Sequence, residues 1–137
     1  MYLGGTTMKV KLIPLIFEET NERERGEYEQ QFAVLKELYG DVAEFLDPIP
    51  VGAKLPECAD AIVFPQMIFA AFRHDEILKG YDLPMIVLTS RFGSIEMWDW
   101  EIVTYLRDLG CKVFAPYSID MAKTVLRALA VKKKLAG

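Results

Sequence analysis

Short apolar segments alternate along this chain with longer segments in which apolar residues recur at helical spacing. Several of the short segments are continuously apolar, which is typical of strands that are covered on both faces of a sheet. Pro14 lies inside the first of them and weighs against a strand there, because proline has no backbone N–H to donate. The expected strands are 10–17 (VKLIPLIF), 42–46, 61–64, 85–89 and 112–114.

The segments between these strands carry the signals of helix ends. Asn21 followed by Glu24 has the spacing of a capping box. Gly40 is expected to end this first helix in the left-handed conformation. Ser118 is the expected N-cap of the last helix. The expected helices cover about 21–39, 69–79, 96–109 and the chain after 118.

Strands that alternate with helices through short links predict right-handed crossovers and a parallel sheet. We therefore expect an α/β fold, a flavodoxin-like three-layer sandwich with a parallel sheet of about five strands in the order 2-1-3-4-5. Residues 8–137 are expected to form a single α/β domain. Residues 1–7 precede a second methionine, Met8, and are interpreted as a leader.

The composition of the chain limits which classes of partner and which cellular compartment we expect. The chain of 137 residues has 16 basic and 20 acidic residues and a net charge of −4, so no basic excess is present to neutralise phosphates and nucleic acid is not expected. No apolar run approaches the length needed to cross a membrane. Cys58 and Cys111 are far apart and have no CxxC partner, which favours a reducing, cytoplasmic setting.

A ligand site is expected where the strand order reverses, outside the carboxyl ends of the first and third strands. Glu18 follows the first strand, Gln66 and Met67 follow the third, and Arg91 and Phe92 follow the fourth. The Gln66 amide either binds a ligand oxygen or bonds the loop backbone. Arg91 either clamps an anion or is a surface residue.

The sequence contains no motif that is typical of cofactor or metal binding. A flavin phosphate would be repelled by Glu18 and Glu19 after the first strand. The dinucleotide pattern G-x-G-x-x-G is absent. His74 is the lone histidine and is interpreted as a surface residue within a helix. We therefore expect no catalytic residue, no metal ligand and no cofactor in this chain.

Two stretches are unusually apolar for segments that leave strand ends: 64–72 (FPQMIFAAF) and 91–101 (RFGSIEMWDWE). Trp98 and Trp100 cannot both face one core, so one of them is expected to be exposed or to contact a partner. With Phe69 they form the predicted interface. The alternative is that both stretches simply cover the end of the sheet.

The segments IVFPQ and LTSRFGSIEMWDWEIVTYLRDLG resemble the N-terminal domain of L-fucose and L-arabinose isomerase-like proteins. The resemblance spans about Met8 to Lys134, the front portion of a complete family member. It implies aldose–ketose interconversion with a divalent metal, commonly manganese, whose ligands come from later domains. It also implies a homo-oligomer in which this domain lends strand-end residues to a neighbouring subunit's sugar pocket, touching by position Gln66, Met67, Arg91, Phe92 and Trp98.

The expected function is therefore that of an N-terminal domain of a metal-dependent sugar isomerase-like protein, which forms the substrate rim and subunit contacts and is inactive alone. The alternative is a stand-alone flavodoxin-like domain that binds a small molecule or regulates a partner.

Overall fold

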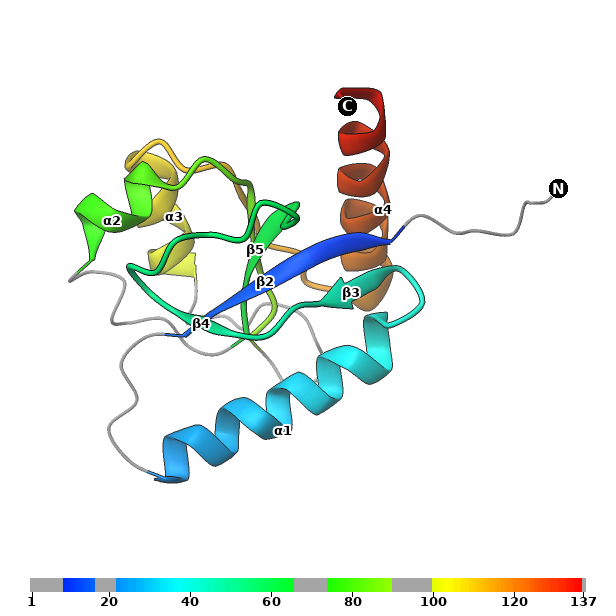
Figure 1. Ribbon diagram of the computed structural model, residues 1–137, viewed down its shortest axis with the longest axis horizontal. Coiled ribbons are helices and arrows are strands. Elements are labelled where there is room, and N and C mark those ends of the chain that lie inside the picture. The colour runs from blue at the N-terminus through cyan, green and yellow to red at the C-terminus, as the bar shows by residue number, and fades with distance from the viewer. Residues whose placement is uncertain (1–8, 17–21, 66–73, 90–99, 137) are drawn as a thin grey trace, which may run out of the picture.

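The fold is described from a computed structural model for residues 9–16, 22–65, 74–89 and 100–136. Helices and strands alternate along these segments (Figure 1). In chain order they are β2 (Val10–Ile16), α1 (Glu22–Tyr39), β3 (Ala43–Phe45), β4 (Ile49–Pro50), β5 (Ala61–Phe64), α2 (Asp75–Gly80), β6 (Met85–Val87), α3 (Trp100–Asp108), β7 (Val113–Phe114) and α4 (Ile119–Ala136).

The strands form one sheet in the order β3-β2-β5-β6-β7, and β4 also pairs with β2. Every pairing is parallel. The predicted α/β class, the parallel sheet and the strand order 2-1-3-4-5 are thereby confirmed. The one added piece is β4, a two-residue strand inside a stretch expected to be loop, which extends the β3 edge alongside the end of β2.

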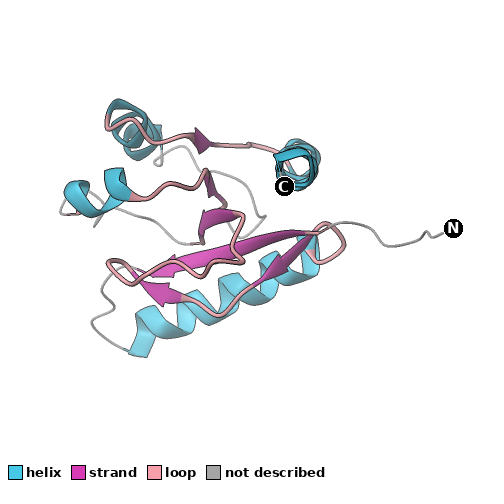
Figure 2. Ribbon diagram, turned by 45° about the horizontal axis from the view of Figure 1, so that its top comes forward, coloured by secondary structure: helices cyan, strands magenta, loops and turns pink. Residues whose placement is uncertain are grey.

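Helices cover both faces of the sheet, giving three layers (Figures 1 and 2). On one face, Leu35 of α1 and Leu126 of α4 pack against Leu12 of β2. On the other face, Leu78 of α2 and Leu106 of α3 belong to the second buried cluster. The alternation along β2 that puts neighbouring residues on opposite faces explains why both clusters draw on the same continuously apolar strand.

Pro14 is buried in the central strand β2, and the sheet accommodates it through an irregular edge. Val10 pairs with Ala43 but Leu15 pairs with Ile49, so the edge chain contains one extra residue between the two pairings. Pro14 falls at this break between β3 and β4. Its backbone nitrogen faces that edge, because alternate residues of β2 bond to alternate sides. The N–H that Pro14 lacks therefore falls where the hydrogen bonds between β2 and the β3–β4 edge are already interrupted.

Two glycines follow helices for different reasons. Gly110 has φ of +95°, and its N–H donates to Arg107 O while Cys111 N–H donates to Leu106 O, the paired bonds of a left-handed helix end. Gly40 was expected to do the same, and that prediction is wrong: it keeps the helical bond to Lys36 O at 3.0 Å without a positive φ. A Cβ at Gly40 would lie 2.6 Å from Lys36 O, so space rather than handedness favours glycine there.

The structure also defines where α4 and α2 begin. Ser118 caps α4 as expected, because its Oγ accepts the Met121 N–H at 3.1 Å. Of the helix expected over 69–79, residues 69–73 lie outside the described residues, and α2 begins at Asp75, preceded by His74 with a non-helical φ of −128° and ψ of 29°. Placing His74 inside a helix was therefore wrong. The acidic pair Asp75 and Glu76 occupies the first turn, where the helix dipole favours negative charge.

Candidate functional site

The carboxyl edge of the sheet is the place where this topology can hold a ligand. The chain leaves β2 after Ile16, β5 after Phe64 and β6 after Val87, and these three strands are neighbours. Strands in a sheet lie about 4.8 Å apart, so the three exits fall within roughly 10 Å of one another. β3 lies on one side of β2 and β5 on the other, so the strand order reverses at β2.

The predicted site residues lie in the segments that follow the carboxyl ends of these strands. Glu18 comes after β2, Gln66 and Met67 after β5, and Arg91 and Phe92 after β6. All five lie outside the described residues, as do Phe69 and Trp98 of the predicted interface. The topology brings the starting points of their segments to one edge, and the predicted role of each side chain stays a prediction.

Gln31 is the buried polar side chain closest to this edge, and sequence reasoning missed it. It lies on α1 with 8% of its surface exposed, and its Nε2 donates to Leu88 O at 2.9 Å. Leu88, the residue directly after β6, donates its N–H to Phe64 O at 3.0 Å and so continues the bonding between β6 and β5. Gln31 therefore fixes α1 against the end of β6. Its spacing from Tyr28 and Leu35, three and four residues, is the signal that places it on the buried face.

Two exposed aromatic residues meet at the same edge of the sheet. Trp100 begins α3 and Tyr117 follows β7; their ring centroids are 6.3 Å apart and the rings are tilted by 47°. Trp100 is 40% exposed and Tyr117 64% exposed. The expectation that one of the two tryptophans would be exposed is met by Trp100, while its role in an interface stays a prediction.

The free edge of β7 is closed to strand addition at one carbonyl. Lys112 O accepts the Met85 N–H, so the Val113 carbonyl points away from the sheet. Arg107 of α3 donates to that carbonyl from Nε at 3.3 Å and from Nη2 at 2.9 Å. A charged side chain on an edge is a common protection against pairing with another chain. The sequence alone gave no signal for this contact.

The opposite, amino-terminal edge carries a mixed polar hollow of about 260 Å³. Its lining is drawn from the turns before β6 and before β7, including Asp82, Pro84 and Cys111. Burial raises the pKa of the Cys111 thiol, which donates a long hydrogen bond to Leu78 O at 3.6 Å. This hollow is the rival location for a polar ligand.

Elsewhere in the described residues, the shifted pKa values reflect burial and contacts that hold the fold together. Burial raises the pKa of Tyr39 to about 12, which keeps its hydroxyl neutral inside the core between α1 and the sheet. The hydrogen bond from Lys123 Nζ lowers the pKa of Asp41 and ties α4 to the turn after α1 at 3.2 Å. Within the described ranges, no three histidine, cysteine or acidic side chains converge as metal ligands.

Comparison of the chain with protein-family models, with curated proteins and with solved structures finds no match. Among the described segments, no helix has both the length and the apolar character needed to cross a membrane.

Proposed function

We propose that this domain binds a sugar at the carboxyl edge of its sheet, in the crevice between the ends of β2 and β5. The observation that supports the proposal is the strand order, which reverses at β2, with β3 on one side and β5 on the other. In open parallel sheets this is where ligands bind.

The residues that follow these strands suit a polyhydroxylated ligand. The Gln66 amide can donate and accept, Glu18 can accept, and Arg91 can donate, which together match the mixed donor and acceptor character of hydroxyl groups. Met67 and Phe92 supply the apolar contact that a sugar's C–H face needs. The carboxylate of Glu18 makes the set less suited to a phosphate.

We further propose that this chain is the N-terminal domain of a metal-dependent aldose–ketose isomerase-like protein. The domain then forms a substrate rim for a neighbouring subunit and does not isomerise sugars alone, since manganese and its ligands belong to later domains of that family. The exposed Trp100–Tyr117 pair supports a role in subunit contact, because aromatic side chains are enriched at the centres of interfaces.

The alternative is a stand-alone binding or regulatory domain. It uses the same crevice and is supported by the same strand order, but it needs no neighbouring subunit to complete the site.

Calorimetric titration with L-fucose, L-arabinose and the corresponding ketoses tests the proposal. We expect binding that weakens about fivefold in Gln66→Leu and in Arg91→Met, as the loss of one hydrogen bond of about 1 kcal/mol requires. Lys9→Met, at an exposed position just before the amino end of β2, is the control and should leave binding unchanged. Absence of binding to every sugar, or binding that neither variant weakens, contradicts the proposal.

Diluting the protein distinguishes a sugar pocket shared between subunits from one formed by the domain alone. If the sugar pocket is shared between subunits, binding disappears at concentrations at which sedimentation shows a monomer. If the domain acts alone, the monomer binds with unchanged affinity.

A further inference from the structure

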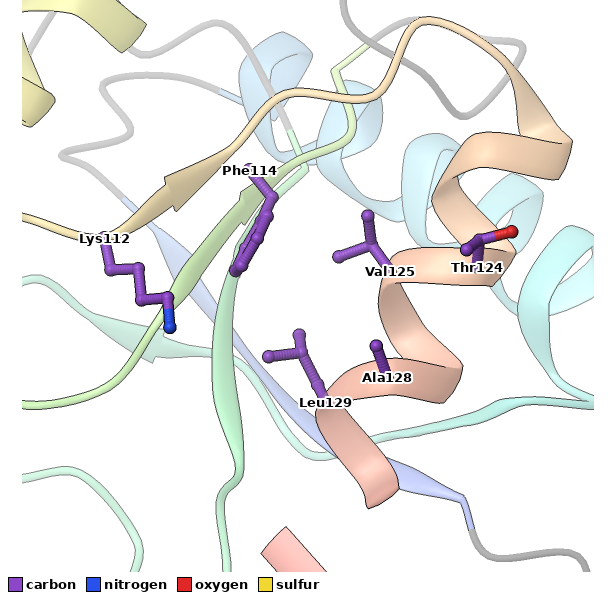
Figure 3. Close-up of a pocket in the computed structure, with 6 residues that line it drawn as sticks. All are labelled: Lys112, Phe114, Thr124, Val125, Ala128 and Leu129. Atoms are coloured by element: carbon purple, nitrogen blue, oxygen red, sulfur yellow. The ribbon is translucent and has the colours of Figure 1, made fainter. Parts of the chain in front are cut away.

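A second cavity lies beside the edge strand, away from the carboxyl edge. This β7–α4 pocket has a volume of about 300 Å³ and is lined by Lys112, Phe114, Thr124, Val125, Ala128 and Leu129. Its size is at the lower end of the range for small-molecule sites, roughly 300–1,000 Å³. Figure 3 shows Lys112 and Phe114 projecting from the strand side toward Val125 and Leu129 on α4.

The walls of the β7–α4 pocket are apolar. Leu129 is 7% exposed and belongs to the core between α4 and the sheet, and Phe114 and Val125 pack against that core as partly buried residues. Ala128 lies one turn after Thr124 on the outer side of the pocket, and its small side chain leaves the space open. The Thr124 hydroxyl donates to Asp120 O at 3.0 Å, within its own helix.

Among the described residues that line this pocket, Lys112 carries a positive charge. Lys112 Nζ lies 5.9 Å from the centroid of the Phe114 ring, so the ammonium is held at the pocket wall. An apolar cavity with one positive charge at its rim is complementary to a molecule with an apolar body and a single negative charge. The Phe114 ring favours an aromatic body, which can pack against it edge to face.

We propose that the β7–α4 pocket binds a small aryl carboxylate, with the ring between Phe114, Val125 and Leu129 and the carboxylate at Lys112 Nζ. The pocket is too small for a helix, and the Val113 carbonyl beside it is occupied by Arg107, which disfavours an added strand. This inference is independent of the proposed sugar site, which lies at another edge of the sheet.

Phenylacetate is the probe, and the amide resonances of the ¹⁵N-labelled full chain are the readout. We expect saturable shifts at Phe114, Val125 and Leu129 with a Kd in the millimolar range, as for ligands of this size. Acetate, which lacks the apolar body, should produce no saturable shifts there. Phenylacetamide, which lacks the charge, should bind roughly twofold to fivefold more weakly, the worth of an ion pair at a partly exposed site.

Two variants test the two halves of the pocket. Lys112→Met keeps the aliphatic stem and should make phenylacetate bind no better than phenylacetamide, while Lys54→Met leaves the preference intact. Ala128→Leu fills the pocket at an exposed helical position and should abolish the saturable shifts. The matched change Ala33→Leu, at an exposed position of α1, should not.

Several outcomes overturn the proposal. They are absence of saturable shifts in the unmodified chain, equal binding of phenylacetate and phenylacetamide, and full binding in Ala128→Leu. Shifts of the same amides with protein concentration alone also count against it, because they would show that a second copy of the chain covers the pocket.

Discussion

Replacing Gln31 by methionine should destabilise the protein by about 1–2 kcal/mol. Methionine keeps the length of the side chain but removes the N–H donor to Leu88 O, which is made at 2.9 Å on a residue only 8% exposed. A buried carbonyl that loses its donor costs about 1–3 kcal/mol, and the added apolar burial of methionine offsets part of that. For a domain of this size, the melting temperature should fall by roughly 3–8 °C.

Urea unfolding followed by circular dichroism measures the effect, with Gln30→Met as the matched control. Gln30 precedes Gln31 on α1 but is exposed, so the same substitution should change the free energy of unfolding by no more than about 0.5 kcal/mol. If the two variants are equally stable, Gln31 does not fasten α1 to the end of β6 and the description of this edge is wrong.

Three further predictions address single contacts. Gly110→Ala should cost about 1 kcal/mol because alanine is strained at φ of +95°, and Gly110→Asn should cost less; urea unfolding that ranks them in the reverse order contradicts the left-handed helix end. Arg107→Met should cost about 1 kcal/mol and increase association at high concentration by uncovering the Val113 carbonyl; light scattering identical to that of the unmodified chain argues against edge protection. Cys58, which is exposed, should react with a thiol reagent at least about tenfold faster than Cys111, whose pKa is raised by burial; equal rates at pH 7 and pH 8 would refute that difference.

The strand order could be predicted because it depends on a strong, repeated signal. Continuously apolar runs alternate with capped helices, and short links leave few topologies for a parallel sheet. The N-cap at Ser118 follows from local chemistry and was predicted on that ground. β4 was missed because a two-residue strand has no periodicity to detect. Its pairing depends on the break opposite Pro14, which only the sheet register reveals.

The candidate site was predictable only as a location. Topology places the exits of β2, β5 and β6 at one edge, but the side chains that would act there come from loops whose conformation apolar patterning does not determine. Gly40 shows the same limit at a helix end, because a close approach of Lys36 O rather than a positive φ selects glycine. The bonds from Arg107 to Val113 O join α3 to the outer side of β7, and no sequence spacing encodes them.

Mapping the amide resonances of the ¹⁵N-labelled chain during a titration with L-fucose tests the proposed sugar site most directly. A sugar bound at this edge should shift Ile16 and Phe64, where β2 and β5 end, together with the segments that follow them, and Leu88. The hollow of about 260 Å³ at the amino-terminal edge is the competing location. Shifts confined to Asp82 and Cys111 at that edge, or no shifts at any sugar concentration, would contradict the proposed sugar site.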